Sequence, residues 1–245
     1  MGNRLAGKVA LITGSARSMG AAQAELFVAE GAQVVIADIL DEEGCHLADK
    51  LGEAATYVHL DVSNEEQWET AVQTTLDTFG ALDILVNNAG VYRRASFEEL
   101  TVELIDLHYR VNQLGVFLGL RAVYEHMKTR GTGSIINVSS ISGLGALPGH
   151  AAYGTTKWAV RGLTKYAAVE FGRHGIRVNS THPGFIDTVM LEENSSEVNA
   201  GIPDVTPLGR KGTVDELAEV TLFLASDASS YVNGAEIAID GGTSI

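Results

Sequence analysis

The sequence predicts a single-domain α/β protein in which a doubly wound parallel sheet of seven strands carries helices on both faces. Short β-branched runs alternate with longer amphipathic stretches along the chain, which is typical of repeated strand-helix-strand units. Hydrophobic residues make up 45% of the 245 residues, enough to fill a core on each face of a sheet. Because no linker, repeat or low-complexity tract divides the chain, residues 1–245 are expected to form one domain.

Seven β-branched runs are expected to be the strands. In chain order they are KVALIT (8–13), QVVIAD (33–38), TYVHLD (56–61), DILVNN (83–88), SIINVSS (134–140), IRVNSTHP (176–183) and AEIAID (235–240). Between them, apolar residues recur at helical spacing at about 19–30, 41–51, 64–79, 102–128, 152–173 and 214–226. Since parallel crossovers are right-handed, this order predicts a three-layer Rossmann fold whose ligands bind beyond the carboxyl ends of the strands.

Residues 188–209, TVMLEENSSEVNAGIPDVTPLG, break this alternation. The stretch is polar, holds two of the four prolines and shows no clear apolar period, which predicts a long connection without regular structure. Such connections in compact domains are more often functional lids than accidents. We therefore expect a mobile flap over the ligand site, the alternative being a plain surface excursion.

Composition argues against several classes of function. The net charge of −14 disfavours nucleic-acid and anionic membrane partners, because both bind basic surfaces. No apolar run approaches the roughly 18 residues that a membrane span requires. The N-terminus lacks the apolar region of a secretory signal, and Cys45 is the only cysteine. We therefore expect a cytoplasmic protein without disulfides or thiolate metal sites.

The segment TGSARSMG, residues 13–20, follows the first strand and opens a helical stretch, as a phosphate-binding turn does. Gly14 permits a tight turn, and Gly20 lets the helix pack closely on the sheet. The spacing does not match G-x-G-x-x-G, so this motif alone is weak support for a nucleotide site.

Asp38 ends the second strand, where a carboxylate accepts hydrogen bonds from both ribose hydroxyls of an adenosine. A 2′-phosphate would meet a like charge there, which favours NAD over NADP. Two alternatives stay open: Asp38 could cap the helix that begins near Asp41, and Arg17 could hold a 2′-phosphate. Asp61-Val62 and Asn87-Asn88-Ala89-Gly90 close the next two strands at the same edge, although singly they are turn signals.

Together these motifs resemble those of the short-chain dehydrogenase/reductase family over essentially the whole chain. The matching elements are TGSARSMG, Asp38, the DV at Asp61, NNAG at Asn87, the Asn in YRVN, the Ser in NVSSISG, the YGTTK box and the HPG before the flap. ADILDEEG, GVFLGLRAV and GSIINVSSISG are most similar to the bacterial NAD-linked hydroxysteroid dehydrogenases of the 3α,20β type. The resemblance implies a homotetramer that pairs through the helices at 102–128 and 152–173 and through the C-terminal segment.

Ser18 departs from the family pattern, which has glycine at that place. A Cβ there narrows the approach to the cofactor diphosphate unless the residue keeps a negative φ and its hydroxyl faces outward or donates to a phosphate oxygen. We expect NAD binding to survive the substitution.

Tyr153 and Lys157 are four residues apart on a predicted helix, so they lie on one face within reach of the same ligand. The ammonium should favour the Tyr153 phenolate and lower its pKa, which would make the phenol an acid/base near neutral pH. Ser140 would hydrogen-bond the substrate oxygen. The register of the family, rather than chemistry, selects Ser140 over Ser139 and Ser142.

The resemblance implies further roles. Asn112 would hold a water that links Lys157 to solvent, Pro183 and Gly184 would shape the turn beneath the nicotinamide, and Ile186 and Thr188 would touch its carboxamide. The residues expected at the cofactor are Gly14, Ser15, Arg17, Ser18, Met19, Asp38, Ile39, Asp61, Val62, Asn88, Ala89, Gly90, Tyr153, Lys157, Pro183, Gly184, Ile186 and Thr188.

The sequence therefore predicts reversible hydride transfer between NAD(H) and a secondary alcohol or ketone. Apolar residues at 144, 147, 185 and 189–191 favour a hydrophobic substrate, with hydroxysteroids among the candidates. One alternative is a reductase of 3-oxoacyl thioesters, which would prefer NADP and a basic docking patch; another is a nucleotide-sensing module without turnover. His150 is a candidate substrate contact and His182 a loop residue; neither has a second histidine at ligand spacing, so no metal is expected.

Overall fold

The computed structural model describes residues 3–193 and 196–245. Within them, seven parallel strands form one sheet in the order β3-β2-β1-β4-β5-β6-β7, as predicted. The strands are β1 (Val9–Thr13), β2 (Gln33–Asp38), β3 (Ala55–His59), β4 (Ile84–Asn87), β5 (Gly133–Val138), β6 (Ile176–Pro183) and β7 (Glu236–Ile239). The chain changes direction across the sheet between β1 and β4, so a crevice opens beyond their carboxyl ends.

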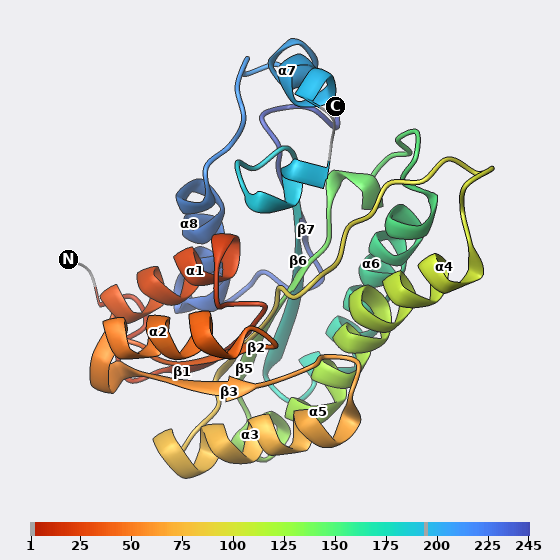
Figure 1. Ribbon diagram of the computed structural model, residues 1–245. Helices are drawn as coiled ribbons and strands as arrows, with labels where there is room; N and C mark the ends of the chain where they lie inside the picture. The colour runs from red at the N-terminus through yellow and green to blue at the C-terminus, as the bar shows by residue number, and fades with distance from the viewer. Residues whose placement is uncertain (1–2, 194–195) are drawn as a thin grey trace.

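Helices cover both faces of the sheet, as Figure 1 shows. α1 (Ser18–Ala29), α2 (Asp41–Leu51) and α8 (Val214–Ala225) lie on one face, and α3 (Glu65–Phe79), α5 (Gly115–Arg130) and α6 (Ala151–Gly172) lie on the other. On the first face Phe27 packs with Ile12 and Ile36; on the second, Trp68 packs with Leu11. Each strand thus buries alternate side chains on opposite faces, which explains why the strands read as nearly continuous apolar runs.

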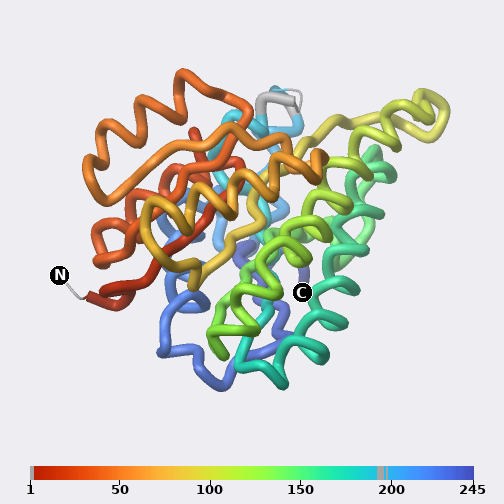
Figure 2. Tube along the Cα trace, turned by 90° about the horizontal axis from the view of Figure 1, so that it is seen from below, coloured from red at the N-terminus to blue at the C-terminus, as the bar shows by residue number. Residues whose placement is uncertain are grey.

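The helix predicted at 102–128 is interrupted. α4 (Val102–His108) passes into a π-helical turn, η2 (Tyr109–Leu114), before α5 begins. Asn112 lies in this widened turn, whose extra residue changes the direction in which the side chains project. α5 and α6 run side by side along one flank of the molecule (Figure 2).

The prediction that 188–209 lacks regular structure was wrong. The described part of this segment contains a short 3-10 helix, η4 (Val189–Glu193), and α7 (Ser196–Val205), which even encloses Pro203. α7 is anchored by Ile202, which is buried, and it ends where Thr206 donates to the Ile202 carbonyl at 2.9 Å. The C-terminal segment holds the far end, since the Leu208 amide donates to the Gly241 carbonyl at 3.1 Å.

Three further 3-10 turns are η1 (Gly52–Ala54), η3 (Ile141–Gly143) and η5 (Asp227–Ser229). Among the described residues, no helix is both long and apolar enough to span a bilayer. Over the same part of the chain, no group of three or more His, Cys, Asp or Glu side chains is arranged to hold a metal ion. Cys45 is exposed.

Candidate active site

The turn after β1 brings the backbone of two segments into close contact. Gly14 has a φ of 63°, and a Cβ on it would lie 2.7 Å from the Ala89 Cα, so only glycine fits. A Cβ on Gly20 would lie 2.6 Å from the Ser15 Cα. The Ser15 hydroxyl donates to the Ile12 carbonyl at 2.6 Å and accepts from the Ala37 amide at 3.1 Å. Ser15 therefore braces the turn and does not offer its hydroxyl to a ligand.

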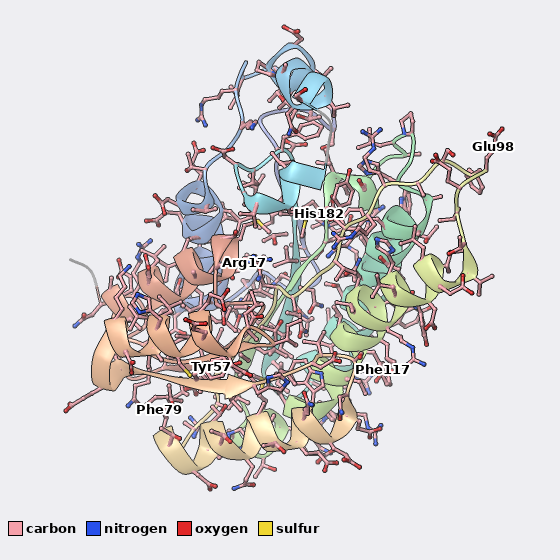
Figure 3. All side chains as sticks on the ribbon, viewed as in Figure 1. Arg17, Tyr57, Phe79, Glu98, Phe117 and His182 are labelled. Carbon is pink, nitrogen blue, oxygen red and sulfur yellow. The ribbon has the colours of Figure 1, made fainter. Side chains whose placement is uncertain are left out.

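Ser18 does not keep a negative φ. Its φ is 52°, and it is the only non-glycine residue among the described ones with a positive value. The left-handed region costs an L-residue about 1–2 kcal/mol, because its Cβ approaches the following carbonyl. Arg17, exposed at the beginning of α1, precedes it (Figure 3), and Met19 lines the crevice. At the position where the family pattern has glycine, the backbone thus keeps the left-handed conformation that glycine adopts easily, although the residue is serine.

Asp38 is buried at the end of β2 and accepts backbone hydrogen bonds with both oxygens. Oδ2 accepts from the Ala16 amide at 2.9 Å, and Oδ1 accepts from the amides of Ile39 and Leu40 at 2.8 and 3.2 Å. These amides precede α2, whose N-cap residue is Leu40 and which has no side-chain cap hydrogen bond, so the contacts described for Asp38 do not cap the helix. Each carboxylate oxygen has two lone pairs, so Oδ2 retains capacity for another donor. Ile39, beside it, is 58% exposed.

The residues that follow β3 are also anchored within the chain. One oxygen of Asp61 accepts from the Ser63 amide at 2.9 Å and from the Ser63 hydroxyl at 2.8 Å. Val62 is buried, and a Cβ on Gly115 would lie 2.8 Å from its Cγ2. Asp61 and Val62 follow β3 at the carboxyl edge, and Asp38 is the last residue of β2. None of the three lines the pocket that contains Tyr153.

The segment after β4 is fixed to the β1 turn. The Asn88 amide group donates to the carbonyls of Thr13 and Gly14 at 2.9 and 3.0 Å, and the Ala89 amide donates to the Thr13 hydroxyl at 3.0 Å. The Asn88 Oδ1 is buried and has no hydrogen-bond partner among the described residues. A buried acceptor without a donor costs free energy, so this atom is prepared for a ligand or a water.

One pocket brings together most of the predicted chemical residues. It is lined by Met19, Asn88, Gly90, Val138, Ser139, Ser140, Tyr153, Lys157, Pro183, Gly184, Ile186, Thr188, Met190 and Leu191. Three strands, β4, β5 and β6, or the turns that follow them contribute to it, together with α1, α6 and the segment that begins at 188. Thr188, Met190 and Leu191 are the residues of the 188–209 segment that line the pocket.

The pKa of Tyr153 differs from the expectation. Burial raises the pKa of the phenol, and the hydrogen bond with Ser140 acts in the opposite direction. Lys157 is near, with its Nζ 5.6 Å from the centre of the Tyr153 ring, but it donates to the Val138 carbonyl at 2.9 Å. Burial also lowers the pKa of Lys157 to about 8, which weakens its charge. The expected lowering of the Tyr153 pKa by Lys157 is therefore not seen in the protein alone.

Asn112 is buried and uses both ends of its side-chain amide on the chain itself. Its Oδ1 accepts from the Val91 amide at 2.8 Å, and its Nδ2 donates to the Val91 carbonyl at 2.9 Å and to the Thr156 hydroxyl at 3.3 Å. A Cβ on Gly90 would lie 3.3 Å from the Asn112 Oδ1 and 3.6 Å from the Lys157 Nζ. Asn112 thus fixes the segment after β4 next to Lys157; its water-holding role stays a prediction.

Three aromatic rings surround Tyr153, and of the two histidines among them the sequence analysis singled out His150 but not His108. Tyr92, His150 and His108 meet it edge-on, with ring centres 5.0, 6.1 and 6.2 Å away. His150 directly precedes α6, whereas only topology brings Tyr92 and His108 to this helix, although the position of Tyr92 two residues after NNAG was a usable signal. His182 lies in β6 and not in a loop (Figure 3); its Nδ1 donates to the Ser140 carbonyl at 3.1 Å.

Comparisons with known proteins agree with this geometry. The family model described as "Enoyl-(Acyl carrier protein) reductase" matches residues 14–244. The chain is 49% identical to the 3-alpha-(or 20-beta)-hydroxysteroid dehydrogenase of Mycobacterium tuberculosis, over 99% of this chain and 92% of the relative. It is 45% identical to the trans-4-hydroxycyclohexanecarboxylate dehydrogenase of Sinomonas cyclohexanicum, over 98% and 94%.

Among solved structures, the chain is similar to a gluconate 5-dehydrogenase from Burkholderia cenocepacia in complex with NADP and tartrate. The TM-score is 0.94 and the identity 39%, with 98% of this chain and 96% of the other covered. The predicted resemblance, including the one to the 3α,20β hydroxysteroid dehydrogenases, is confirmed by these matches.

Proposed function

The chain belongs to the short-chain dehydrogenase/reductase family, and from this premise we propose that it catalyses NAD(H)-dependent interconversion of a hydrophobic, cyclic secondary alcohol and its ketone. The observation that carries the proposal is the single pocket in which Ser140, Tyr153 and Lys157 meet Met19 and Gly184. In this proposal Tyr153 would be the acid/base and Ser140 the hydrogen-bond donor, both beside the proposed nucleotide crevice.

The crevice fits a nicotinamide dinucleotide. The unpartnered Asn88 Oδ1 offers a buried acceptor, Gly90 leaves space opposite Lys157, and the beginning of α1 favours a diphosphate. Residues 14–19 would hold the diphosphate, Asp38 and Ile39 the adenosine ribose, Asp61 and Val62 the adenine, and residues 88–90, 183–184, 186 and 188 the nicotinamide half. When bound, the dinucleotide supplies or accepts the hydride.

The side chains of this protein handle the proton. Tyr153 and Ser140 would both hydrogen-bond the substrate oxygen, and Tyr153 would donate its proton to a ketone or take one from an alcohol. The raised pKa of Tyr153 keeps the phenol protonated in the free protein, which suits the reductive direction. For alcohol oxidation, Lys157 and the positive charge of the oxidised cofactor together would oppose the effect of burial on the Tyr153 pKa.

Asp38 supports NAD over NADP. Its buried carboxylate sits where the ribose is bound in this fold, and a 2′-phosphate would face that charge at short range. Since such like-charge contacts cost several kcal/mol, kcat/KM should favour NAD by at least about 100-fold. The related gluconate 5-dehydrogenase was solved with NADP, so the fold itself does not decide the cofactor.

A cofactor comparison tests this choice. Initial rates are measured with NAD and NADP, for the unchanged protein and for Asp38→Asn, which removes the charge but keeps an acceptor for the backbone amides. The preference for NAD should fall sharply in the variant. Equal use of both cofactors by the unchanged protein would contradict the NAD proposal without touching the assignment as an oxidoreductase.

The apolar side chains of Met190 and Leu191 in the same pocket support a hydrophobic substrate and a flap that closes over it. The substrate test is a coupled assay with cyclohexanol, trans-4-hydroxycyclohexanecarboxylate, hydroxysteroids and an acetoacetyl thioester. Turnover of a cyclic alcohol with NAD is the expected result. Turnover of the thioester alone, with NADPH, would replace the proposal by the 3-oxoacyl reductase alternative.

The proposal includes a cytoplasmic homotetramer. Large apolar side chains are exposed along the neighbouring helices α5 and α6: Phe117, Trp158, Tyr166 and Val169. An apolar face of this kind favours association with another copy, as the family resemblance implies. Light scattering measures the mass directly, and a monomer at micromolar concentration would contradict the tetramer.

A further inference from the structure

Both ring nitrogens of His150 are engaged by hydroxyl groups beside Tyr153. The Ser142 Oγ lies 2.9 Å from Nδ1, and the Tyr92 hydroxyl lies 3.0 Å from Nε2. Each hydroxyl can donate or accept, so either neutral tautomer satisfies both contacts. Burial, with a smaller contribution from Arg94, lowers the pKa of His150 to about 4, so the ring is neutral at pH 7. The His150 ring therefore joins Ser142 to Tyr92 through hydrogen bonds at both of its nitrogens.

The contacts of His150 belong to a series of side-chain and backbone contacts that runs from Ser140 to Tyr153, the proposed catalytic pair. The Ser142 amide donates to the Ser140 Oγ at 3.1 Å, and the Ser142 hydroxyl reaches His150. His150 reaches Tyr92, whose ring meets Tyr153 edge-on at 5.0 Å and 75°. Tyr153 and Ser140 line the same pocket, so both ends of this series of contacts lie at the proposed catalytic pair.

The position of His150 in the chain makes this link effective. It directly precedes α6, the helix that carries Tyr153 and Lys157, and its carbonyl accepts from the Gly154 amide at 2.6 Å. The loop that begins at Ser140 ends at His150. Arg161 of α6 also holds the loop, since its Nη1 donates to the Gly143 carbonyl at 2.7 Å. That bond fixes the backbone at Gly143, whereas His150 holds the Ser142 side chain, so without His150 the Ser140 hydroxyl could shift relative to the phenol.

His108 provides an internal comparison. Its ring is 6.2 Å from the Tyr153 ring, about as far as that of His150. Its Nδ1 donates to the Leu104 carbonyl at 2.8 Å, and its Nε2 accepts from the Arg93 amide at 3.2 Å. In the contacts described, His108 thus bonds backbone groups of Leu104 and Arg93. Of the two histidines, His150 is the one that bonds the Ser142 side chain.

We propose that His150 is a positioning residue: by linking Ser142 to Tyr92, it sets the separation of the Ser140 and Tyr153 hydroxyls. The inference rests on the proposed dehydrogenase function. It assigns His150 no proton transfer and no direct bond to substrate.

The test compares variants that keep or lose hydrogen bonding at similar volume. His150→Leu fills the site without polar atoms, whereas His150→Gln carries an amide that can donate and accept. Because small misplacements of reacting groups are costly, kcat should fall by about 10- to 100-fold in His150→Leu, with little change in KM for NAD or alcohol. His150→Gln should recover much of the loss, and Tyr92→Phe should resemble His150→Leu. His46→Ala, an exposed histidine on α2, is the control and should leave kcat unchanged.

Equal kcat values for His150→Leu and the unchanged protein would overturn the proposal, as would equal losses in the Leu and Gln variants, because a space-filling role predicts no difference between them. Melting temperatures are recorded for every variant. If His150→Leu does not fold, Tyr92→Phe, which keeps the ring, decides the question in the same way. The unchanged protein is assayed first. If it oxidises no alcohol, the proposed function is wrong. If it does, and the kcat of His150→Leu equals that of the unchanged protein, only the role of His150 is wrong.

Discussion

The two ends of the parallel sheet hold polar residues in different ways. At the carboxyl end, Tyr153 and Lys157 are buried with shifted pKa values, and Asn88 has an acceptor without a partner. At the amino end lies a larger cavity of about 520 Å³, whose lining includes Asp83 and Ser134. Asp83 accepts from the Val9 amide at 2.9 Å and from Arg130 at 2.8 Å. The larger cavity is therefore not the one that holds the proposed catalytic residues.

The two ends differ in the hydrogen bonding of their buried polar groups. Most of those at the amino end bond other groups of the chain and so stabilise the fold, whereas the carboxyl end keeps an acceptor free for the proposed ligand. Ser134 donates to the Leu224 carbonyl at 2.8 Å, and Asn233 bonds the Val178 amide and the Ala168 carbonyl, both at 2.9 Å. These contacts join strands to the ends of helices. Two residues are exceptions in the described structure. The Arg177 Nη1 is buried without a partner, although its Nη2 bonds the carbonyls of Leu224 and Ser226. The Nε2 of His126, which lies near Asp83 and Arg130, is also buried without a partner.

The strongest test of this contrast is Tyr153→Phe at the carboxyl end. Loss of the acid/base should lower kcat by about 10²- to 10⁴-fold, while the melting temperature stays the same, because the ring packing is kept. Tyr166→Phe, on the exposed side of the same helix, is the matched control and should be unaffected. An unchanged oxidation rate in Tyr153→Phe would mean that the pocket is not a catalytic one.

Lys157 should make stability depend on pH. Its pKa is about 8 when folded, below the ordinary value of 10.5, so between these values the unfolded chain binds more protons. The free energy of unfolding should therefore rise with pH from about 8 towards about 10, by up to about 3 kcal/mol. Below pH 8 the lysine is charged in both states, and the cost of burying the charge is fully present.

Lys157→Met removes this ionisation, so its denaturation midpoint should be flat where that of the unchanged protein rises. The window ends near pH 10, because the raised pKa of Tyr153 keeps the folded phenol protonated while unfolded tyrosines ionise, which lowers stability. Urea titrations at intervals between pH 7.5 and 10 measure the effect. Parallel pH profiles for the two proteins would show that Lys157 is not desolvated as the structure indicates.

Most of the fold could be predicted from the sequence because alternation of apolar runs decides it. All seven strands lie where the β-branched runs predicted them, and Asp38, Asn88, Ser140 and Lys157 are at the predicted edge. α7 could not be predicted, because its proline and glycine hide a helix anchored by one buried residue, Ile202. In α7 the burial of Ile202 outweighs the low helix propensity of glycine and proline.

The environment of Tyr153 was also beyond the sequence. Spacing on a helix places Lys157 near Tyr153, but it says nothing of burial, and burial decides the sign of the Tyr153 pKa shift. The contacts of His150 depend on a loop and on the segment after β4, which are distant in sequence from each other. Likewise, φ at Ser18 follows from the turn geometry and not from the residue type.

Asp83→Asn tests the amino end. The variant keeps the shape of the side chain but replaces one acceptor oxygen by an amide and removes the charge that faces Arg130. Because Asp83 is buried, the free energy of unfolding should fall by about 1–3 kcal/mol, whereas kcat at 25 °C should be retained in the folded fraction. A loss of kcat without a loss of stability would contradict the structural role that we assign to the amino end of the sheet.

Ser18→Gly should produce the smallest effect, and in the stabilising direction. Glycine adopts a φ of 52° without the steric cost that serine bears, although it adds flexibility to the unfolded chain, so the net gain should be about 1 kcal/mol. Ser18→Ala separates the two parts of the side chain: it keeps the strained Cβ but lacks the hydroxyl, so it should not be stabilised. NADH titration of the three proteins then shows whether the hydroxyl contributes to binding. If Ser18→Gly is less stable than the unchanged protein, the serine hydroxyl holds the turn more strongly than the backbone strain opposes it, and the carboxyl end of the sheet would owe stability to a residue placed where the ligand binds.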